Sequence, residues 1–145
     1  IYEDYQRSSN LMSVILQAAT KKINSLKING NDYPTDDGTA ERDFIHISDL
    51  IDGHFFALDK IGTLENYIEI NLGTGKSVSV LEMVKAFKKV NKIDFRVEFA
   101  AEREGDISIN YAEVYKAREI LGWQSSHNLE KMCKDAWEAI QNDCK

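Results

Sequence analysis

Two arginines in this chain, Arg42 and Arg103, have the side-chain chemistry that suits a diphosphate. A guanidinium group can pair two of its N–H groups with two phosphate oxygens, so two such groups converging on one site would form a diphosphate clamp. The sequence around Arg103 is Glu102-Arg103-Glu104, and a local ion pair would use the same charge. Spacing alone therefore favours two separate surface or ion-paired arginines over a clamp.

The overall charge makes the placement of arginines important. The net charge is −6 at pH 7, so binding of an anion would depend on arginines gathered at one place. The chain has only five of them: Arg7, Arg42, Arg96, Arg103 and Arg118. The acidic balance also argues against a nucleic-acid partner.

A glycine-rich turn, Leu72-Gly73-Thr74-Gly75, is a second candidate for phosphate binding. Glycine lets backbone N–H groups approach a phosphate at the start of a helix. The Gly-x-Gly-x-x-Gly motif is incomplete here, and no second strand–helix unit repeats it. A tight turn between a strand and a helix is the favoured interpretation.

The three histidines form no catalytic pattern. His46 lies between Ile45 and Ile47 on an expected strand, so alternation turns its side chain to the opposite face. This favours a hydrogen-bonded structural histidine over a general base. His54 and His127 have no partner pattern. No Ser-His-Asp or Cys-His set can be assembled, and we predict no catalytic residue in this chain.

Metal and disulfide chemistry are not predicted either. Asp32, Asp36 and Asp37 do not match the calcium loop of EF-hands, so we interpret them as solvated loop residues. Cys133 and Cys144 fall in one stretch with a helical pattern, which would set them roughly 16 Å apart, far beyond disulfide reach. Neither has a histidine at zinc-ligand spacing. A reducing, cytoplasmic setting is the simpler interpretation.

Size and composition indicate one modest globular domain. The chain has 145 residues, of which 43% are hydrophobic and 29% are charged. No apolar run approaches the roughly 20 residues that cross a bilayer, so no membrane partner is expected. The first residue is Ile1, which indicates a fragment or a processed chain.

The elements expected to position these residues are those of a mixed α/β protein. Apolar spacing predicts helices over 9–22, 49–61, 113–121 and 128–142. Ser48 and Asp49 are expected to start the second of these helices. A capping box at Ser79 and Glu82 opens a further helix. Alternation predicts strands over 25–29, 42–47, 67–72 and 95–99.

Four motifs resemble one protein family in their order and spacing. They are Gly-Asn-Asp-Tyr-Pro-Thr-Asp-Asp-Gly-Thr at 30–39 followed by Arg-Asp-Phe-Ile-His-Ile-Ser-Asp-Leu at 42–50, Asn-Leu-Gly-Thr-Gly at 71–75, Arg-Glu-Gly-Asp at 103–106 and Leu-Gly-Trp at 121–123. On these motifs the chain resembles the UDP-glucose (UDP-galactose) 4-epimerases, which belong to the extended short-chain dehydrogenase/reductase superfamily. The resemblance covers nearly the whole chain, and the loop at 30–39 is its most epimerase-like part.

The resemblance implies an α/β fold that is the carboxy-terminal, substrate-binding part of such an enzyme, with short strands and about five helices. Members of the family bind NAD in an amino-terminal Rossmann half that carries a Tyr-x-x-x-Lys pair. This sequence contains no Tyr-x-x-x-Lys and no Gly-x-x-Gly-x-x-Gly. Residues 1–145 would then bind the UDP-sugar, and residues about 43–75 would pack on the absent NAD-binding domain.

The resemblance also implies roles for the residues around the nucleotide. Asn10 and Leu11 match positions beside the diphosphate and the nucleotide. Lys27 and Asn29 match positions that contact uracil through backbone groups. No residue for binding NAD is assigned within this chain.

Further matches concern the diphosphate and the ribose. Arg42 and Arg103 match the phosphate-binding arginines, which supports the clamp that spacing alone does not. Asp106 matches a residue that hydrogen-bonds ribose hydroxyls. Val80 matches an apolar residue of the pocket.

Two positions of the implied sugar pocket vary within the family. Phe44 stands where many members have tyrosine, so one hydroxyl contact would be missing. Asn110 matches a position that is a bulky tyrosine in some members and a small residue in others. With the smaller residue here, the intact enzyme is expected to tolerate N-acetylated UDP-sugars.

The function implied is interconversion of UDP-galactose and UDP-glucose through NAD, with this chain supplying UDP-sugar binding and lacking activity alone. The intact enzyme would be a homodimer formed through its other half. Two alternatives stay open: a dehydratase or decarboxylase of the same superfamily, and a stand-alone nucleotide-sugar-binding module. If the chain depends on the other half, Phe55, Phe56 and Leu58 should form an exposed apolar face.

Overall fold

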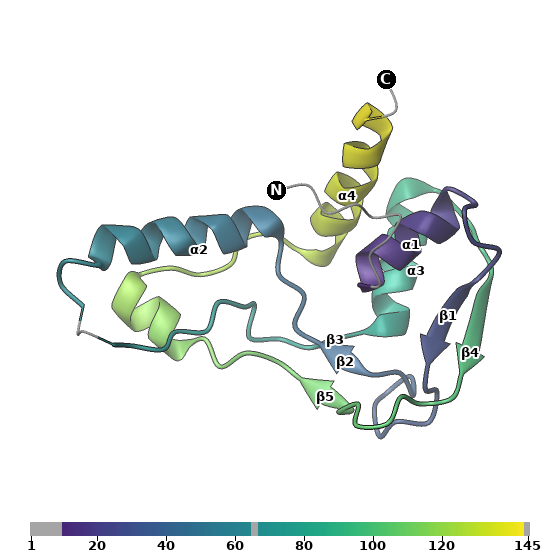
Figure 1. Ribbon diagram of the computed structural model, residues 1–145, viewed down its shortest axis with the longest axis horizontal. Coiled ribbons are helices and arrows are strands. Elements are labelled where there is room, and N and C mark those ends of the chain that lie inside the picture. Colours follow the sequence, from purple (N-terminus) through teal and green to yellow (C-terminus); the bar gives the residue numbers. More distant parts are fainter. Residues whose placement is uncertain (1–9, 65–66, 144–145) are drawn as a thin grey trace.

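The computed structural model describes residues 10–64 and 67–143, which form two regions joined by a small sheet (Figure 1). At one end lie α1, β1, β4, α3 and α4, which we call the core region. At the other end lie α2, residues 67–75 and η1, which we call the α2 region. The small sheet of β2, β3 and β5 runs between the two (Figure 1).

The three helices of the core region confirm the predicted helices, and the cap expected at Ser79 is present. For α1 (Leu11–Ala19), Oδ1 of Asn10 accepts a hydrogen bond from the N–H of Ser13 at 2.8 Å. For α3 (Val80–Asn91), Oγ of Ser79 accepts from the N–H of Glu82 at 2.9 Å. The third, α4, spans Leu129–Asp143. Such caps satisfy N–H groups that the first helical turn leaves unpaired.

Two small sheets accompany these helices. β1 (Leu26–Asn29) pairs in parallel with β4 (Val97–Ala100), which confirms the strands predicted at 25–29 and 95–99. β2 (Glu41–Arg42) lies between two neighbours, antiparallel to β3 (Val78–Ser79) and parallel to β5 (Ile109–Asn110). This second sheet brings Arg42 beside Asn110, far along the chain.

The main hydrophobic core lies among α1, β1, α3 and α4. Phe87 at its centre is fully buried, and its ring lies 6.3 Å from that of Phe95 and 6.1 Å from that of Trp137. The buried residues of this core are Ile15, Leu16, Ala18, Leu26, Ile28, Met83, Val84, Phe87, Cys133 and Ile140. Burial of this kind is the main favourable contribution to folding.

The strand predicted over 42–47 is wrong beyond its first residue. After β2 the chain is irregular from Asp43 to His46, and α2 then spans Ile47–Lys60. The cap of α2 is His46, whose Nδ1 accepts a hydrogen bond from the N–H of Ser48 at 3.1 Å. The prediction that Ser48 and Asp49 start this helix is therefore also wrong, because a histidine ring takes the capping role.

The strand predicted over 67–72 is wrong as well. Residues 67–72 belong to no sheet, because the described part of the chain places no strand beside them. Ile70 and Leu72 instead pack against a small cluster made by Ala117, Leu121 and Trp123. The alternating apolar pattern is thus used for packing rather than for a strand ladder.

The helix predicted over 113–121 appears as η1 (Ala117–Leu121), a short π-helix preceded by two α-helical residues, Tyr115 and Lys116. Gly122 follows with φ +71°, which ends the helix in a conformation that glycine adopts easily. With η1, the fold has the expected five helices and short strands within the described residues.

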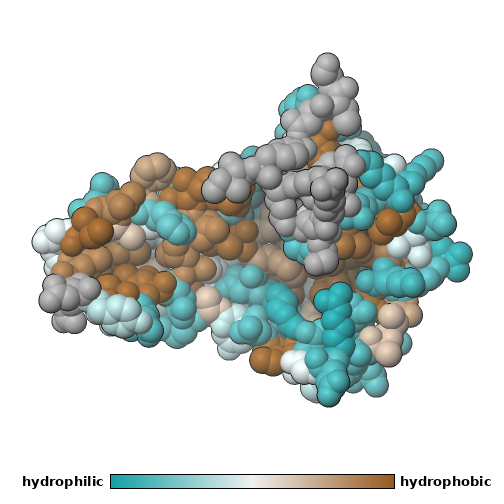
Figure 2. Space-filling view, viewed as in Figure 1, coloured by the Kyte–Doolittle hydropathy of each residue, from teal (hydrophilic) through white to brown (hydrophobic). Residues whose placement is uncertain are grey.

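The α2 region leaves much of its apolar surface uncovered, and Figure 2 shows hydrophobic residues spread over this end of the molecule. On α2, Phe55 is 61% exposed, Phe56 43% and Leu58 58%. Exposed large apolar patches mark places where proteins meet other surfaces. Across the described ranges, no helix has the length and apolar character needed to cross a membrane.

Candidate functional site

A cleft of about 720 Å³ opens between α1, β1 and the exposed segment that follows β4. Seven of the ten residues assigned to the site line this cleft: Leu11, Lys27, Asn29, Arg42, Val80, Arg103 and Asp106. Arg42 and Arg103 are therefore brought to one place. Local spacing favoured separate positions for them, and on that point the structure agrees with the resemblance.

Arg42 is held by two backbone carbonyl groups and lies near a carboxylate. Its Nη1 donates to the carbonyl oxygens of Glu41 at 2.8 Å and of Ile107 at 2.7 Å. Its Nη2 lies 3.8 Å from Oδ1 of Asp106, and both side chains remain about one-third exposed. The guanidinium group is thus fixed at the rim of the cleft, while part of it still faces solvent.

Arg103 is held by Asn29 across the strand ends. With the Asn29 amide oxygen facing it, Asn29 accepts from Nε of Arg103 at 3.0 Å and from Nη2 at 3.1 Å. Within residues 10–64 and 67–143, Arg103 forms no ion pair with a carboxylate. The expected local pairing with Glu102 or Glu104 is therefore not the arrangement found.

Val80 is placed in the cleft by a network that ties the loop at 30–39 to the start of α3. Asp37 accepts hydrogen bonds from the N–H of Thr39 at 3.0 Å, from its hydroxyl at 2.7 Å and from Oγ of Ser79 at 2.5 Å. Oγ1 of Thr39 in turn accepts from the N–H of Leu81 at 3.2 Å. The interpretation of Asp37 as a solvated loop residue is wrong.

These contacts also change the acidity of Asp37. Partial burial by itself would raise the pKa of this carboxyl, but the hydrogen bonds from Ser79 and Thr39 outweigh it and hold the pKa below its ordinary value. The loop bends back at Gly38, which has φ +77°. A side chain there would place its Cβ 2.3 Å from the carbonyl oxygen of Asn31, so glycine is required.

The glycine-rich turn at 73–75 binds an anion, but that anion is a side chain of the protein. The carboxylate of Asp43 accepts from the N–H groups of Thr74 at 2.9 Å, Gly75 at 3.0 Å and Ala112 at 3.2 Å. The hydroxyl of Thr74 donates to it as well, at 2.6 Å. The backbone donors that a phosphate would need are already used, so this is a structural turn, as the incomplete motif favours.

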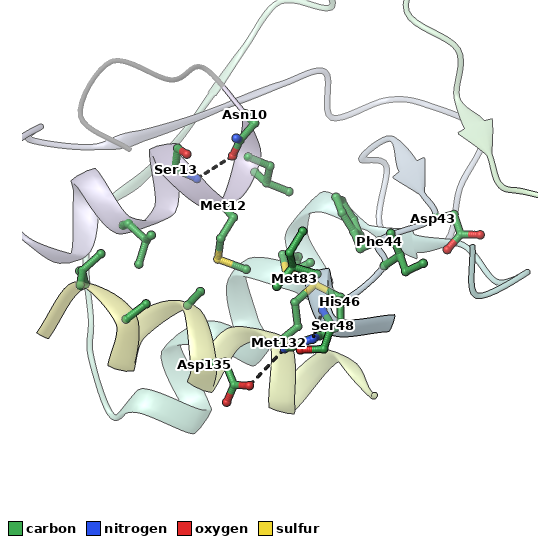
Figure 3. Close-up of a pocket in the computed structure, with 17 residues that line it drawn as sticks. Asn10, Met12, Ser13, Asp43, Phe44, His46, Ser48, Met83, Met132 and Asp135 are labelled. Carbon is green, nitrogen blue, oxygen red and sulfur yellow. Dashed lines mark hydrogen bonds and ion pairs between the residues drawn. The ribbon is translucent and has the colours of Figure 1, made fainter. Parts of the chain in front are cut away.

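The remaining three assigned residues lie beside the cleft rather than in it. Asn10 and Phe44 line a separate, largely apolar pocket of about 710 Å³ between α1 and α4, together with Met12 and Met132 (Figure 3). Leu11 lines both this pocket and the cleft.

Asn110 lines a third, shallower pocket of about 380 Å³, which shares Arg42 with the cleft. The three cavities therefore meet at residues that they share.

His46 has the structural role expected of it. It is 4% exposed, and its Nε2 lies 3.1 Å from Oδ2 of Asp135 (Figure 3). Its ring stacks on that of His127, with 4.5 Å between the ring centroids. His127, for which the sequence shows no partner pattern, also has a partner, because its Nδ1 lies 2.7 Å from Oδ1 of Asp49.

Asp49 is a buried carboxylate, 2% exposed, that joins α2 to the segment before α4. It accepts from the N–H of His127 at 3.0 Å and from Oγ of Ser126 at 3.0 Å. Burial by itself would raise the pKa of Asp49, but the hydrogen bonds from His127 and Ser126 lower it to about 2. No local pattern indicates this contact, since its partners lie 77 and 78 residues away.

Cys133 and the possible metal ligands of the described residues can be considered together. Cys133 is a free, buried thiol, and burial together with Glu130 raises its pKa to about 11, which leaves it protonated and unreactive. Cys144, like Arg7, lies outside the described residues. Among the residues that are described, no three His, Cys, Asp or Glu side chains could hold a metal ion together.

Comparison with known proteins identifies the family. A family model described as GDP-mannose 4,6 dehydratase matches residues 4–136. The chain belongs to this family. Its resemblance to the epimerases is confirmed by UDP-glucose 4-epimerase from Bacillus subtilis, which is 47% identical over 129 residues, 89% of this chain and 38% of that protein.

Solved structures of this family have the same fold. UDP-glucose 4-epimerase from Stenotrophomonas maltophila, crystallised with NAD and formylated UDP-arabinopyranose, superposes with a TM-score of 0.91 at 34% identity. It is matched over 100% of this chain and 43% of its own. The UDP-Glc/GlcNAc 4-epimerase of Campylobacter jejuni gives a TM-score of 0.85 at 38% identity, over 97% of this chain and 45% of its own. The chain thus has the fold of the carboxy-terminal part of these enzymes and spans about two-fifths of their length.

Proposed function

We propose that this chain binds a UDP-sugar in the cleft between Arg42 and Arg103, as the carboxy-terminal part of a UDP-glucose 4-epimerase. The observation that carries the proposal is the convergence of these two arginines, from distant segments, on one cleft of about 720 Å³. The volume of the cleft lies within the range of small-molecule sites. The chain is acidic overall, yet two guanidinium groups line this one cleft.

Each cleft residue has a role in this proposal. Arg42 and Arg103 bind the diphosphate, and Asp106, beside Arg42, accepts hydrogen bonds from the ribose hydroxyls. The strand end at Lys27 and Asn29 offers backbone groups to the uracil ring. Leu11 and Val80 supply apolar surface for the base and ribose, and Asn10 lies next to Leu11 at the start of α1.

The complete protein is proposed to use NAD, which supplies hydride transfer at C4 of the sugar when it is bound. The Stenotrophomonas maltophila enzyme holds NAD, and this chain matches 43% of it. The described residues offer one cleft with two arginines, and the nucleotide sugar fills it. NAD is therefore assigned to the part of the protein beyond this chain, and what these residues do is bind and orient the sugar nucleotide.

The exposed face of α2 is proposed to pack on that NAD-binding part, together with the rest of residues 43–75. The exposure of Phe55 and Leu58 supports this, as does a strand-like segment at 67–72 that lies in no sheet of the described chain. The chain alone is then a binding part without epimerase activity. The homodimer and the cytoplasmic location expected from the sequence are part of this proposal for the complete protein.

The sugar pocket is proposed to accept N-acetylated UDP-sugars. Phe44 and Asn110 lie in the cavities on either side of the cleft, and Asn110 is an exposed, moderately small side chain. The Campylobacter jejuni enzyme, 38% identical, is described as a UDP-Glc/GlcNAc 4-epimerase. Turnover of UDP-galactose and of UDP-N-acetylgalactosamine by the complete protein should both be measurable, and no turnover of the second rejects this part.

Isothermal titration calorimetry tests the binding role directly. UDP and UDP-glucose should bind the wild-type chain, and Arg103→Leu should weaken UDP binding about 10- to 100-fold, because a charge-assisted pair with phosphate is lost. Arg96→Leu is the matched control, since Arg96 is 74% exposed and pairs with Glu98 outside the cleft. Equal affinity of all three proteins for UDP would contradict the assignment of the cleft.

A chimera tests the catalytic part of the proposal. This chain would replace the matching carboxy-terminal part of the Bacillus subtilis epimerase, to which it is 47% identical. Conversion of UDP-galactose to UDP-glucose is the expected result. The alternative is a dehydratase, in keeping with the description of the matching family model. Failure of a folded chimera to convert UDP-galactose would contradict the epimerase assignment.

A further inference from the structure

The two arginines of the cleft differ in how they are held. Arg42 is fixed by two carbonyl oxygens and lies near Asp106. For Arg103 the structure gives one partner among the described residues, the amide of Asn29. Its direction therefore depends on a single side chain.

The position of Asn29 follows from the β1–β4 pair. Asn29 lies opposite Ala100 in the parallel ladder, and the N–H of Gly30 donates to the carbonyl of Ala100 at 2.9 Å. The chain then turns between Arg103 and Asp106, where the N–H of Asp106 donates to the carbonyl of Arg103 at 3.1 Å. The ladder thus fixes the backbone of Asn29 close to the segment that carries Arg103.

The contact uses one edge of the guanidinium group and leaves another open. The oxygen of Asn29 accepts from Nε at 3.0 Å and from Nη2 at 3.1 Å, which is the side edge of the planar group. The opposite amide orientation would set NH₂ against these donors. The outer edge, formed by Nη1 and the second hydrogen of Nη2, keeps the two parallel donors that match a phosphate.

A neutral partner also preserves the charge of Arg103. An aspartate at position 29 could hold the same edge, but its negative charge would oppose the binding of a diphosphate. An amide oxygen fixes the direction of the guanidinium group without neutralising it. Both residues line the cleft, so the contact between them lies at the site itself.

We propose that the side chain of Asn29 is a positioning residue, which aims the outer edge of Arg103 at the diphosphate. This rests on the proposed binding of a UDP-sugar in the cleft. The backbone of Asn29 keeps its separate assignment to the uracil ring. The side chain acts through Arg103 and needs no contact with the ligand.

Calorimetry with UDP and with uridine separates this role from a structural one. Asn29→Leu should weaken UDP binding about three- to tenfold, because Arg103 is no longer oriented to pair with the diphosphate. The affinity for uridine, which has no phosphate, should stay within about twofold of the wild-type value. In a variant that already carries Arg103→Leu, adding Asn29→Leu should change UDP affinity by less than about twofold, because the guanidinium group that Asn29 orients is absent. Asn142→Leu, an exposed position on α4, is the control for adding leucine.

A spectroscopic signature gives a second readout. The Nε–H of Arg103 should appear as a slowly exchanging resonance in ¹H–¹⁵N spectra of the wild type and should be lost in Asn29→Leu. Asn29→Asp, which remains polar at the strand end, should keep this resonance yet still weaken UDP binding. These spectra also report whether each variant is folded.

The outcomes distinguish this inference from the function on which it rests. If the wild type does not bind UDP, the proposed function fails and the inference fails with it. If UDP binds and Arg103→Leu weakens it while Asn29→Leu does not, only the positioning role is overturned. Additive losses in the double variant, or equal losses for UDP and uridine, would also overturn it.

Discussion

Two helices of similar length show how the core region and the α2 region differ. Phe87 lies on the 12-residue α3 and is fully buried, whereas Phe55 lies on the 14-residue α2 and is 61% exposed. Both helices carry apolar faces, so the difference lies in what covers them. α3 packs on α4 and β1, while the described part of the chain covers α2 on one side only, with η1 and residues 67–72.

This difference separates a part that buries its apolar side chains in its own core from a part that leaves them exposed. The cleft belongs mainly to the first part, because α1, β1, the start of α3 and the segment after β4 line it, with Arg42 added from β2. The exposed apolar residues belong to the second. The proposed site for the nucleotide and the proposed docking face for the NAD-binding half thus lie toward opposite ends of the molecule (Figure 1).

The largest expected effect contrasts the two phenylalanines. Phe87→Ala should lower the free energy of unfolding by about 3–5 kcal/mol, because it removes a fully buried ring and leaves a cavity. Phe55→Ala should change it by less than about 0.5 kcal/mol in this chain, since the ring is exposed. Urea denaturation measures both, and similar losses would mean that the two regions do not differ as described.

The next effect concerns the contact between the α2 region and the small sheet. Asp43→Asn should cost about 2–3 kcal/mol, because an amide NH₂ would face the N–H groups of Thr74 and Gly75. Asp36→Asn is the matched control on an exposed loop residue. Urea denaturation of both variants gives the comparison, and equal stability of the two would show that the carboxylate does not hold the turn.

A pH dependence is expected for the contact made by Asp49. Its pKa in the folded protein is about 2, below its ordinary value of 3.8, so its charged form stabilises the fold above about pH 4. This stabilisation, about 2 kcal/mol, is lost as the pH falls through 2. The stability difference between wild type and Asp49→Asn should therefore shrink between pH 5 and pH 2. Asp52→Asn, exposed on the same helix, should show little difference at any of these pH values.

The smallest effect compares two glycines with open space around them. Nothing lies within 4 Å of a Cβ added at Gly62, after α2, or at Gly105, in the turn beside the cleft. Gly105 has φ +84°, so Gly105→Ala should cost about 1 kcal/mol through backbone strain. Gly62→Ala should gain up to about 0.5 kcal/mol by restricting the unfolded chain. Thermal unfolding of both variants reports whether each substitution raises or lowers stability. A loss of stability in Gly62→Ala would contradict the open, unstrained position described for Gly62.

Local patterns predicted the core region well. The cap at Ser79 and the strands β1 and β4 follow from nearest-neighbour chemistry, which acts within a few residues. The strand predicted at 67–72 failed because a strand needs a partner, and the described chain supplies none there. An alternating pattern indicates that a segment can form a strand. It does not show whether a second strand lies beside that segment to pair with it.

The site depends on contacts that no local pattern contains. Asp37 meets Ser79 across 42 residues, and Asp49 meets His127 across 78. Composition and spacing treat these carboxylates as ordinary loop or helix-start residues. The convergence of Arg42 and Arg103 was likewise indicated only by the family resemblance, because the fold that joins them is encoded by the whole chain.

Hydrogen–deuterium exchange of this chain, with and without UDP-glucose, tests the central claim most directly. The account predicts slow exchange in α3 and β1, faster exchange in α2, and added protection on ligand binding at residues 26–29 and 103–110 but not at 47–60. Ligand-induced protection confined to α2, or none at the two cleft segments under saturating UDP-glucose, would contradict it.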